Sequence, residues 1–137
     1  MGLSALDTLV WPGLVTVAAL VVYYGLSLNV GRARVRYGVA PPETNGNPDF
    51  ERVLRVQENT TEQLVLFLPS LWLYALFVNP LWAAVLGSVW VVGRVLYALG
   101  YYEASERRTP GFAVSVVATL ILLGGALVGL LRRLVLP

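Results

Sequence analysis

The chain has 137 residues, of which 57% are hydrophobic and only 13% are charged, and its formal net charge is +2. Soluble domains carry about 25% charged residues, so this composition excludes an ordinary soluble domain and indicates an integral membrane protein. All ten basic residues are arginine, and the sequence contains no lysine, histidine or cysteine. This excludes zinc sites of the Cys/His type, disulfides, cysteine nucleophiles, histidine bases and Schiff-base lysines.

Long apolar segments account for most of the chain. A bilayer core of about 30 Å requires roughly 20 apolar residues in a helix, and four segments can supply them. The second is short in apolar residues, but the polar segment before it has helical spacing and extends it. We predict one domain over residues 1–137, an all-α integral membrane protein built as a four-transmembrane-helix bundle. The predicted spans cover residues 6–30, 52–78, 81–103 and 110–133.

The connections between the spans predict the topology. Residues 31–49 are rich in proline, glycine and asparagine, which is typical of a loop. The second connection, near residues 78–80, is very short, and the third covers residues 103–110. Four spans place the first and third connections on one face, which carries most of the arginines, so the positive-inside rule predicts that both loops are cytoplasmic. The first span lacks the features of a cleaved signal peptide and is expected to be retained.

Polar residues at membrane depth form two sets with helical spacing. Arg55, Asn59 and Glu62 stand at i, i+4 and i+7, on one stripe of a helix. A second stripe contains Arg94, Tyr97, Tyr101 and Arg108, provided that the third helix continues to residue 108. Ionisable groups within a membrane span are costly, and they usually face a bundle interior or a water-filled cavity.

Two interpretations of these stripes are open. In the first, Arg55 pairs with Glu58 or Glu62, Arg94 pairs with Glu62 or another carboxylate, and the tyrosines anchor the helix at the membrane interface. In the second, the stripes converge at the end of the bundle where the loop arginines gather. Because arginine binds carboxylates through two parallel hydrogen bonds, such a site suits an anion with several carboxylates.

Two motifs resemble a known family. The segment PPETNGNPDFERVLRVQENTTE at residues 41–62 precedes an apolar span and contains the pattern E-R-V-x-R-x-x-x-N-x-x-E. The segment RVLYALGYY at residues 94–102 supplies an arginine and two tyrosines. Both are similar to the signature of the membrane-associated proteins in eicosanoid and glutathione metabolism, the MAPEG family. The resemblance implies a homotrimer of four-helix subunits that binds glutathione between neighbouring subunits near the cytoplasmic face.

The resemblance also implies roles for individual residues. Glu62 would hold the amino group of glutathione, and Arg55 and Arg34 would hold its carboxylates. Arg108 would lie beside the glutathione sulfur, although a one-residue shift would exchange it with Arg107. No metal is expected. The expected glutathione-binding residues are Arg34, Arg55, Gln57, Asn59, Glu62, Tyr97 and Tyr101.

The expected function is conjugation of glutathione to lipophilic electrophiles, with reduction of lipid hydroperoxides as a possible further activity. The ligand would supply the thiol that the chain lacks, and an arginine would favour its thiolate form. Gln63, Gly38 and Val35 differ from residues of eicosanoid-forming members, which favours a general transferase in a bacterial inner membrane. The expected partners are glutathione, a hydrophobic electrophile, the bilayer and two further copies of the chain, without nucleic acid. The alternatives are a non-catalytic lipid-binding scaffold resembling the five-lipoxygenase-activating protein, and a small transporter or structural bundle.

Overall fold

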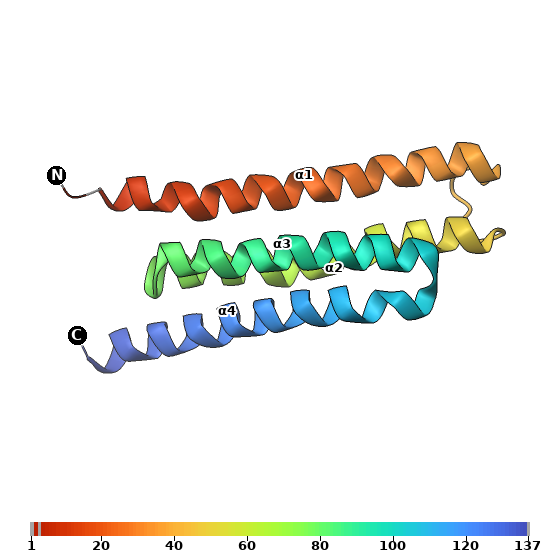
Figure 1. The fold of residues 1–137 in the computed structure, drawn as a ribbon. Helices are drawn as coiled ribbons and strands as arrows, with labels where there is room; N and C mark the ends of the chain where they lie inside the picture. The colour runs from red at the N-terminus through yellow and green to blue at the C-terminus, as the bar shows by residue number, and fades with distance from the viewer. Residues whose placement is uncertain (1, 3, 137) are drawn as a thin grey trace.

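The computed structural model describes residues 2 and 4–136 and consists of long helices (Figure 1). The helices are α1 (Ala5–Tyr37), α2 (Pro48–Phe77), α3 (Pro80–Glu103) and α4 (Thr109–Val135), with a short 3-10 helix η1 (Ser105–Arg108) before α4. No β-strand occurs in the described residues. The predicted all-α class is confirmed. Successive helices run in opposite directions, so both described ends of the chain lie at the same end of the molecule.

Local capping chemistry explains where three of the helices begin. At α1, the Ser4 side chain accepts a hydrogen bond from the backbone N–H of Asp7, and the Asp7 carboxylate accepts one from the backbone N–H of Ser4. Asn47 and Asn79 each cap a helix whose first residue is proline. Asparagine satisfies the free N–H groups of the first turn, and proline lacks the N–H that would have no partner there.

The first connection is shorter than the sequence suggested. Residues 31–37 were predicted to lie in a loop, but α1 continues through them to Tyr37. The segment begins with a single glycine, Gly31, which weakens a helix without breaking it, and the arginine, alanine and valine residues that follow are compatible with a helix. The helix ends at Gly38, whose φ of +67° is the left-handed conformation that glycine adopts readily.

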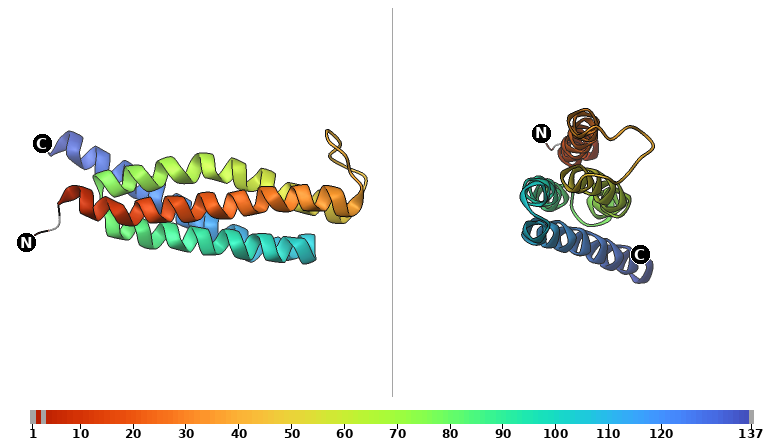
Figure 2. Two further views of the ribbon diagram at one scale, coloured as in Figure 1. Left: turned by 90° about the horizontal axis from the view of Figure 1, so that it is seen from above. Right: turned by 90° about the vertical axis from the view of Figure 1, so that its right-hand side faces the viewer.

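Helices α2 and α3 form the middle of the bundle, with α1 on one side and α4 on the other (Figure 2). The core between them is built on Phe67 of α2 and Trp90 of α3, whose rings stack in parallel with their centroids 4.0 Å apart. Both side chains are fully buried, together with Ala19 of α1 and Leu122 of α4. All four helices therefore contribute to one apolar core.

Three glycines bring the end of α3 against η1 and the start of α4. A Cβ at Gly111 would collide with the backbone N of Tyr97, and one at Gly93 would lie 3.0 Å from the backbone N of Ser115. A Cβ at Gly100 would collide with the carbonyl of Arg107. Only glycine permits such close backbone approaches. This packing places η1 and the first turns of α4 beside the polar stripe of α3.

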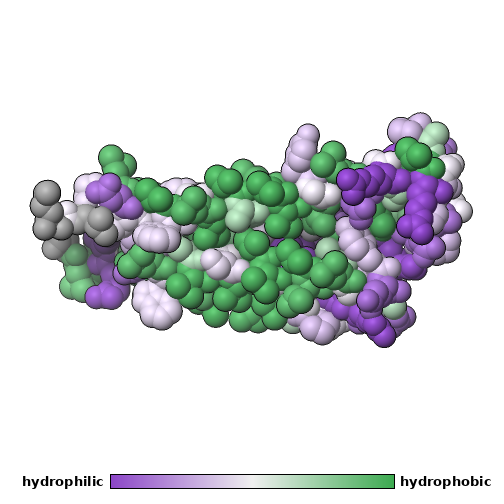
Figure 3. All heavy atoms as spheres, turned by 45° about the horizontal axis from the view of Figure 1, so that its top comes forward, coloured by the Kyte–Doolittle hydropathy of each residue, from purple (hydrophilic) through white to green (hydrophobic). Residues whose placement is uncertain are grey.

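The surface agrees with a membrane protein. On the face drawn in Figure 3, hydrophobic side chains cover the middle of the molecule and hydrophilic side chains gather mainly at one end. Three helical segments are long and apolar enough to cross a membrane, namely Ala5–Tyr37, Pro80–Glu103 and Ser105–Val135. Helix α2 is not among them because its first half is charged and its apolar part covers only residues 64–77. A role for α2 as the fourth span stays a prediction.

Candidate functional site

A cavity of about 330 Å³ lies at the end of the bundle that carries η1 and the α1–α2 connection. Four consecutive helical elements supply its lining. The lining residues are Arg55 and Asn59 of α2, Tyr97 and Tyr101 of α3, Arg108 of η1 and Phe112 of α4. A second cavity of about 520 Å³ also reaches Arg55 and Tyr101. The two polar stripes predicted from the sequence therefore converge on one cavity.

The α2 stripe is an exposed charge network. Arg55 Nη1 donates to Glu62 Oε1 at 3.2 Å and lies 3.7 Å from Glu58 Oε2. Asn59 Nδ2 donates to Glu62 Oε2 at 3.4 Å. The Arg55 and Glu62 side chains are 47% and 56% exposed. The ion pairs of the first interpretation are thus present for Arg55, but such exposed pairs contribute only about 0–1 kcal/mol. A charged ligand can displace them at little cost.

Arg94 lies behind the cavity and is fully buried. Its Nη1 donates to Asn59 Oδ1 at 2.8 Å, and its Nη2 donates to Ser115 Oγ at 2.9 Å. Its guanidinium carbon also lies 4.2 Å from the centroid of the Tyr97 ring. No carboxylate in residues 2 and 4–136 forms an ion pair with Arg94, so the predicted pairing with Glu62 is wrong. The packing of α3 against α2 and α4 buries Arg94 among neutral oxygens instead.

Aromatic rings form the opposite wall of the cavity. The Tyr97 and Tyr101 rings meet edge to face with centroids 5.6 Å apart, and the Tyr97 and Phe112 centroids are 6.1 Å apart. The Arg108 guanidinium carbon lies 5.5 Å from the centroid of Tyr101, close enough for a cation–π interaction. Arg108 Nη1 also donates to the Ser105 carbonyl at 3.1 Å. An exposed cation is thus held at the cavity edge.

Arg108 reaches the cavity by a route that the sequence did not predict. The stripe required α3 to continue to residue 108, but α3 ends at Glu103 and η1 follows. The backbone reverses in η1, and the Arg108 side chain comes back over Tyr101. Arg107 forms an ion pair with Glu103 and does not line the cavity. The structure therefore places Arg108 at the cavity and Arg107 outside it.

Three predicted residues do not line the cavity. Glu62 is linked to it through Arg55 and Asn59. Arg34 Nη1 donates to the Glu43 carbonyl at 2.7 Å and to the Val39 carbonyl at 3.3 Å, so it braces the α1–α2 connection. Gln57 Nε2 donates to the hydroxyl of Tyr23 on α1 at 3.0 Å.

Phe112 lines the cavity, but the sequence offered no indication of it. It stands in an otherwise apolar segment, and only the approach of α4 to α3 brings it to Tyr97. The sequence did indicate that Arg94 is important, because it is the only charged residue between Pro80 and Tyr102. Its place behind the cavity, bonded to Asn59, could not be read from helical spacing alone.

Comparisons with known proteins agree with the family resemblance of the two sequence motifs. The model of the MAPEG family matches residues 12–128. The chain is 56% identical over 126 residues to an uncharacterized protein of Synechocystis sp., covering 92% of each chain. It is 44% identical over 100 residues to human microsomal glutathione S-transferase 2, covering 72% of this chain and 68% of the relative. It is 38% identical to leukotriene C4 synthase of Cavia porcellus, covering 87% and 79%. The chain therefore belongs to the MAPEG family of membrane proteins.

Proposed function

We propose that this protein is a membrane glutathione transferase that conjugates glutathione to lipophilic electrophiles. One observation carries the proposal: five residues of the two polar stripes, brought together from three helical elements, line one cavity. These residues are Arg55, Asn59, Tyr97, Tyr101 and Arg108. Relatives named as glutathione S-transferase and leukotriene C4 synthase support a glutathione-related membrane enzyme.

Glutathione would bind by exchanging charge partners on α2. In the free protein, Arg55 and Glu62 pair with each other while half exposed. The ligand's amino group would take the place of Arg55 at Glu62, and a ligand carboxylate would take the place of Glu62 at Arg55. Two ion pairs would replace one, so that neither Arg55 nor Glu62 would be left unpaired. Asn59 would keep its bond to Arg94 and present its amide N–H groups to the ligand.

Arg108 would activate the sulfur. A free cysteine thiol titrates at about pH 8.5, and a neighbouring guanidinium favours the thiolate by stabilising its charge. The thiolate sulfur attacks the electrophilic carbon and forms a carbon–sulfur bond, while the leaving group departs with its electron pair and the thiol proton goes to water. In a peroxidase side activity, two glutathione molecules would reduce a lipid hydroperoxide to an alcohol and water and become a disulfide.

The positions of Arg34 and Gln57 support a site shared between subunits. Both lie on the α1 side of α2, bonded to the α1–α2 connection and to Tyr23. They could contact the same glutathione only by extending from a neighbouring copy. We therefore include in the proposal a homotrimer with glutathione between subunits, with α2 as a fourth span and the site end of the bundle in the cytoplasm. A bacterial inner membrane is the proposed location.

Calorimetric titration of the detergent-purified protein with glutathione tests this function, followed by an assay with a chromogenic aryl halide. Saturable binding at or below millimolar glutathione and glutathione-dependent release of halide are expected. Binding without turnover of any of several aryl halides and lipid hydroperoxides would refute the enzyme. Absence of binding at millimolar glutathione would leave the lipid-binding scaffold as the function.

A further inference from the structure

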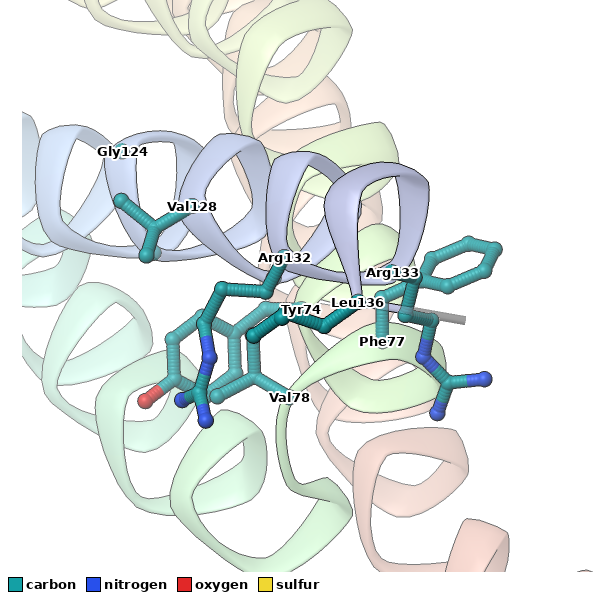
Figure 4. A pocket seen from close by; sticks show the side chains of 10 residues that line it. Tyr74, Phe77, Val78, Gly124, Val128, Arg132, Arg133 and Leu136 are labelled. Carbon is teal, nitrogen blue, oxygen red and sulfur yellow. The ribbon is translucent and has the colours of Figure 1, made fainter.

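A second hollow lies at the opposite end of the bundle, beside the chain termini. It is a groove of about 530 Å³ between the last turns of α2 and the C-terminal half of α4. Its lining includes Tyr74 of α2, Val78 directly after α2, and Val128, Arg132 and Arg133 of α4 (Figure 4). The groove is distant from the candidate glutathione cavity, and the proposed function makes no use of it.

Glycines of α4 shape the groove. A Cβ at Gly125 would collide with the Tyr74 ring, and one at Gly129 would lie 2.7 Å from the Phe77 carbonyl oxygen, so these two glycines let α4 contact α2. Gly124 is different, because no atom lies within 4 Å of a Cβ built on it. The space beside Gly124 is open. This part of the groove wall is therefore bare helix backbone, suited to an extended apolar chain.

The groove has a cationic end. Figure 4 shows the Arg132 side chain extending past Tyr74 and that of Arg133 on the other side of Leu136. The Arg133 guanidinium carbon lies 5.5 Å from the centroid of Phe77. No carboxylate within residues 2 and 4–136 forms an ion pair with either arginine. At 1.5 Å per residue, Arg132 stands about 12 Å along α4 from Gly124.

The position of α4 indicates at which depth of the membrane each end of the groove lies. The segment Ser105–Val135 is apolar enough to span a membrane, and the two arginines stand in its last turn. Arginine at a span end places its guanidinium at the level of the lipid headgroups, while Gly124 and Val128 lie at the depth of the acyl chains. On the cytoplasmic face of membranes, basic pockets between transmembrane helices bind anionic headgroups. The groove presents the same combination of arginines and an apolar wall at the other end of the bundle.

We propose that this groove binds an anionic phospholipid. Its phosphate would lie between Arg132 and Arg133, and one acyl chain would follow α4 past Val128 to Gly124. A second copy of the chain is a poorer occupant, because Asp7 is the only described carboxylate near this end of the bundle. Its carboxylate is already bonded to the backbone N–H of Ser4. The phosphate supplies the negative charge that the described part of the protein does not.

Native mass spectrometry of the purified protein tests the proposal, with phosphatidylglycerol titrated against phosphatidylcholine. Two variants separate the parts of the site. Gly124→Leu adds an apolar side chain to the groove at a position where a Cβ meets nothing within 4 Å. Its matched control is Gly13→Leu on α1, where a Cβ also meets nothing within 4 Å. Arg132→Gln/Arg133→Gln removes the cationic end.

The wild type and Gly13→Leu should bind phosphatidylglycerol in preference to phosphatidylcholine. The double arginine variant should lose about 5-fold in affinity for each arginine removed, and Gly124→Leu should lose the saturable binding with both arginines intact. If Gly124→Leu binds phosphatidylglycerol as the wild type does, surface charge alone holds the lipid and the groove proposal is wrong. If Gly124→Leu instead dissociates an oligomer in the same spectra, a second copy occupies the groove and the proposal is equally wrong.

Discussion

Arg94 donates a 2.8 Å hydrogen bond from Nη1 to Oδ1 of Asn59, and this bond joins the buried interior of α3 to the edge of the candidate cavity. The bond orients the Asn59 amide, because its oxygen faces Arg94 while its Nδ2 donates to Glu62. Arg94 thus positions Asn59 without lining the cavity itself. Ser115 holds the other side of the guanidinium.

Replacing Arg94 should weaken glutathione binding and stability together. A hydrogen bond to a charged group contributes about 1.5–3 kcal/mol, so Arg94→Gln should lower the free energy of unfolding by about that amount. The KM for glutathione should rise by roughly tenfold, since Asn59 loses its orientation. Ser115→Ala is the control, because it removes a partner of Arg94 but leaves the bond to Asn59. An equal rise in KM for both variants would show that Arg94 acts only on stability.

Arg108 should act on the chemical step. Loss of one electrostatic stabiliser typically lowers kcat about 100-fold or more, so Arg108→Ala should reduce kcat in the aryl halide assay with little change in the Kd for glutathione. Its rate should recover as pH rises toward about 8.5, where the thiol ionises unaided.

The neighbouring arginine provides a matched control for that experiment. Arg107→Ala removes an exposed ion pair with Glu103 outside the cavity and should leave kcat unchanged. If Arg107→Ala abolishes turnover while Arg108→Ala does not, the assignment is displaced by one residue. If neither variant affects turnover, another group stabilises the thiolate.

Glu62 should act on binding rather than on turnover. Glu62→Gln keeps the shape of the side chain but loses the charge partner of the ligand's amino group, so the Kd for glutathione should rise about tenfold or more. Calorimetry measures this directly. Glu58→Gln is a suitable control, because Glu58 also lies near Arg55 but at 3.7 Å. Equal effects of the two variants would remove the specific role of Glu62.

Mixed oligomers test whether Arg34 and Arg108 of different copies complete one site. Chains with Arg34→Ala and chains with Arg108→Ala should each be nearly inactive as pure proteins. If they are coexpressed in equal amounts, about a quarter of the sites should receive both wild-type arginines, because each site in the proposed symmetric ring would draw on two neighbouring copies. Activity that stays at the level of the pure variants would place both residues in one subunit.

Gly111 should be needed for the α3–α4 contact that builds the cavity. Gly111→Ala would push a methyl group into the backbone at Tyr97, and such overpacking typically costs about 1–3 kcal/mol. The melting temperature and glutathione affinity should both fall. The control Gly124→Ala adds the same methyl group where nothing lies within 4 Å, and the greater helix propensity of alanine should stabilise it slightly. Similar losses in both variants would refute this role for Gly111.

The sequence alone was sufficient for features that depend on local periodicity and composition. Few charges among long apolar segments indicate a membrane protein of helices, and the spacing of Arg55, Asn59 and Glu62 places them on one helical stripe. In the structure these three side chains do contact one another. Each of these inferences involves residues within a turn or two of each other.

Tertiary structure decided every feature that depends on contact between helices. One of the two open interpretations paired Arg94 with a carboxylate, but the neighbours that α2 and α4 bring to it are Asn59 and Ser115. Arg108 lies against Tyr101 because the chain reverses direction in η1, where the Arg107 carbonyl packs closely on Gly100. Helical spacing alone does not predict this reversal. The physical reason is that helical periodicity determines which side chains share a face. The close approach of backbones at glycines determines which faces meet.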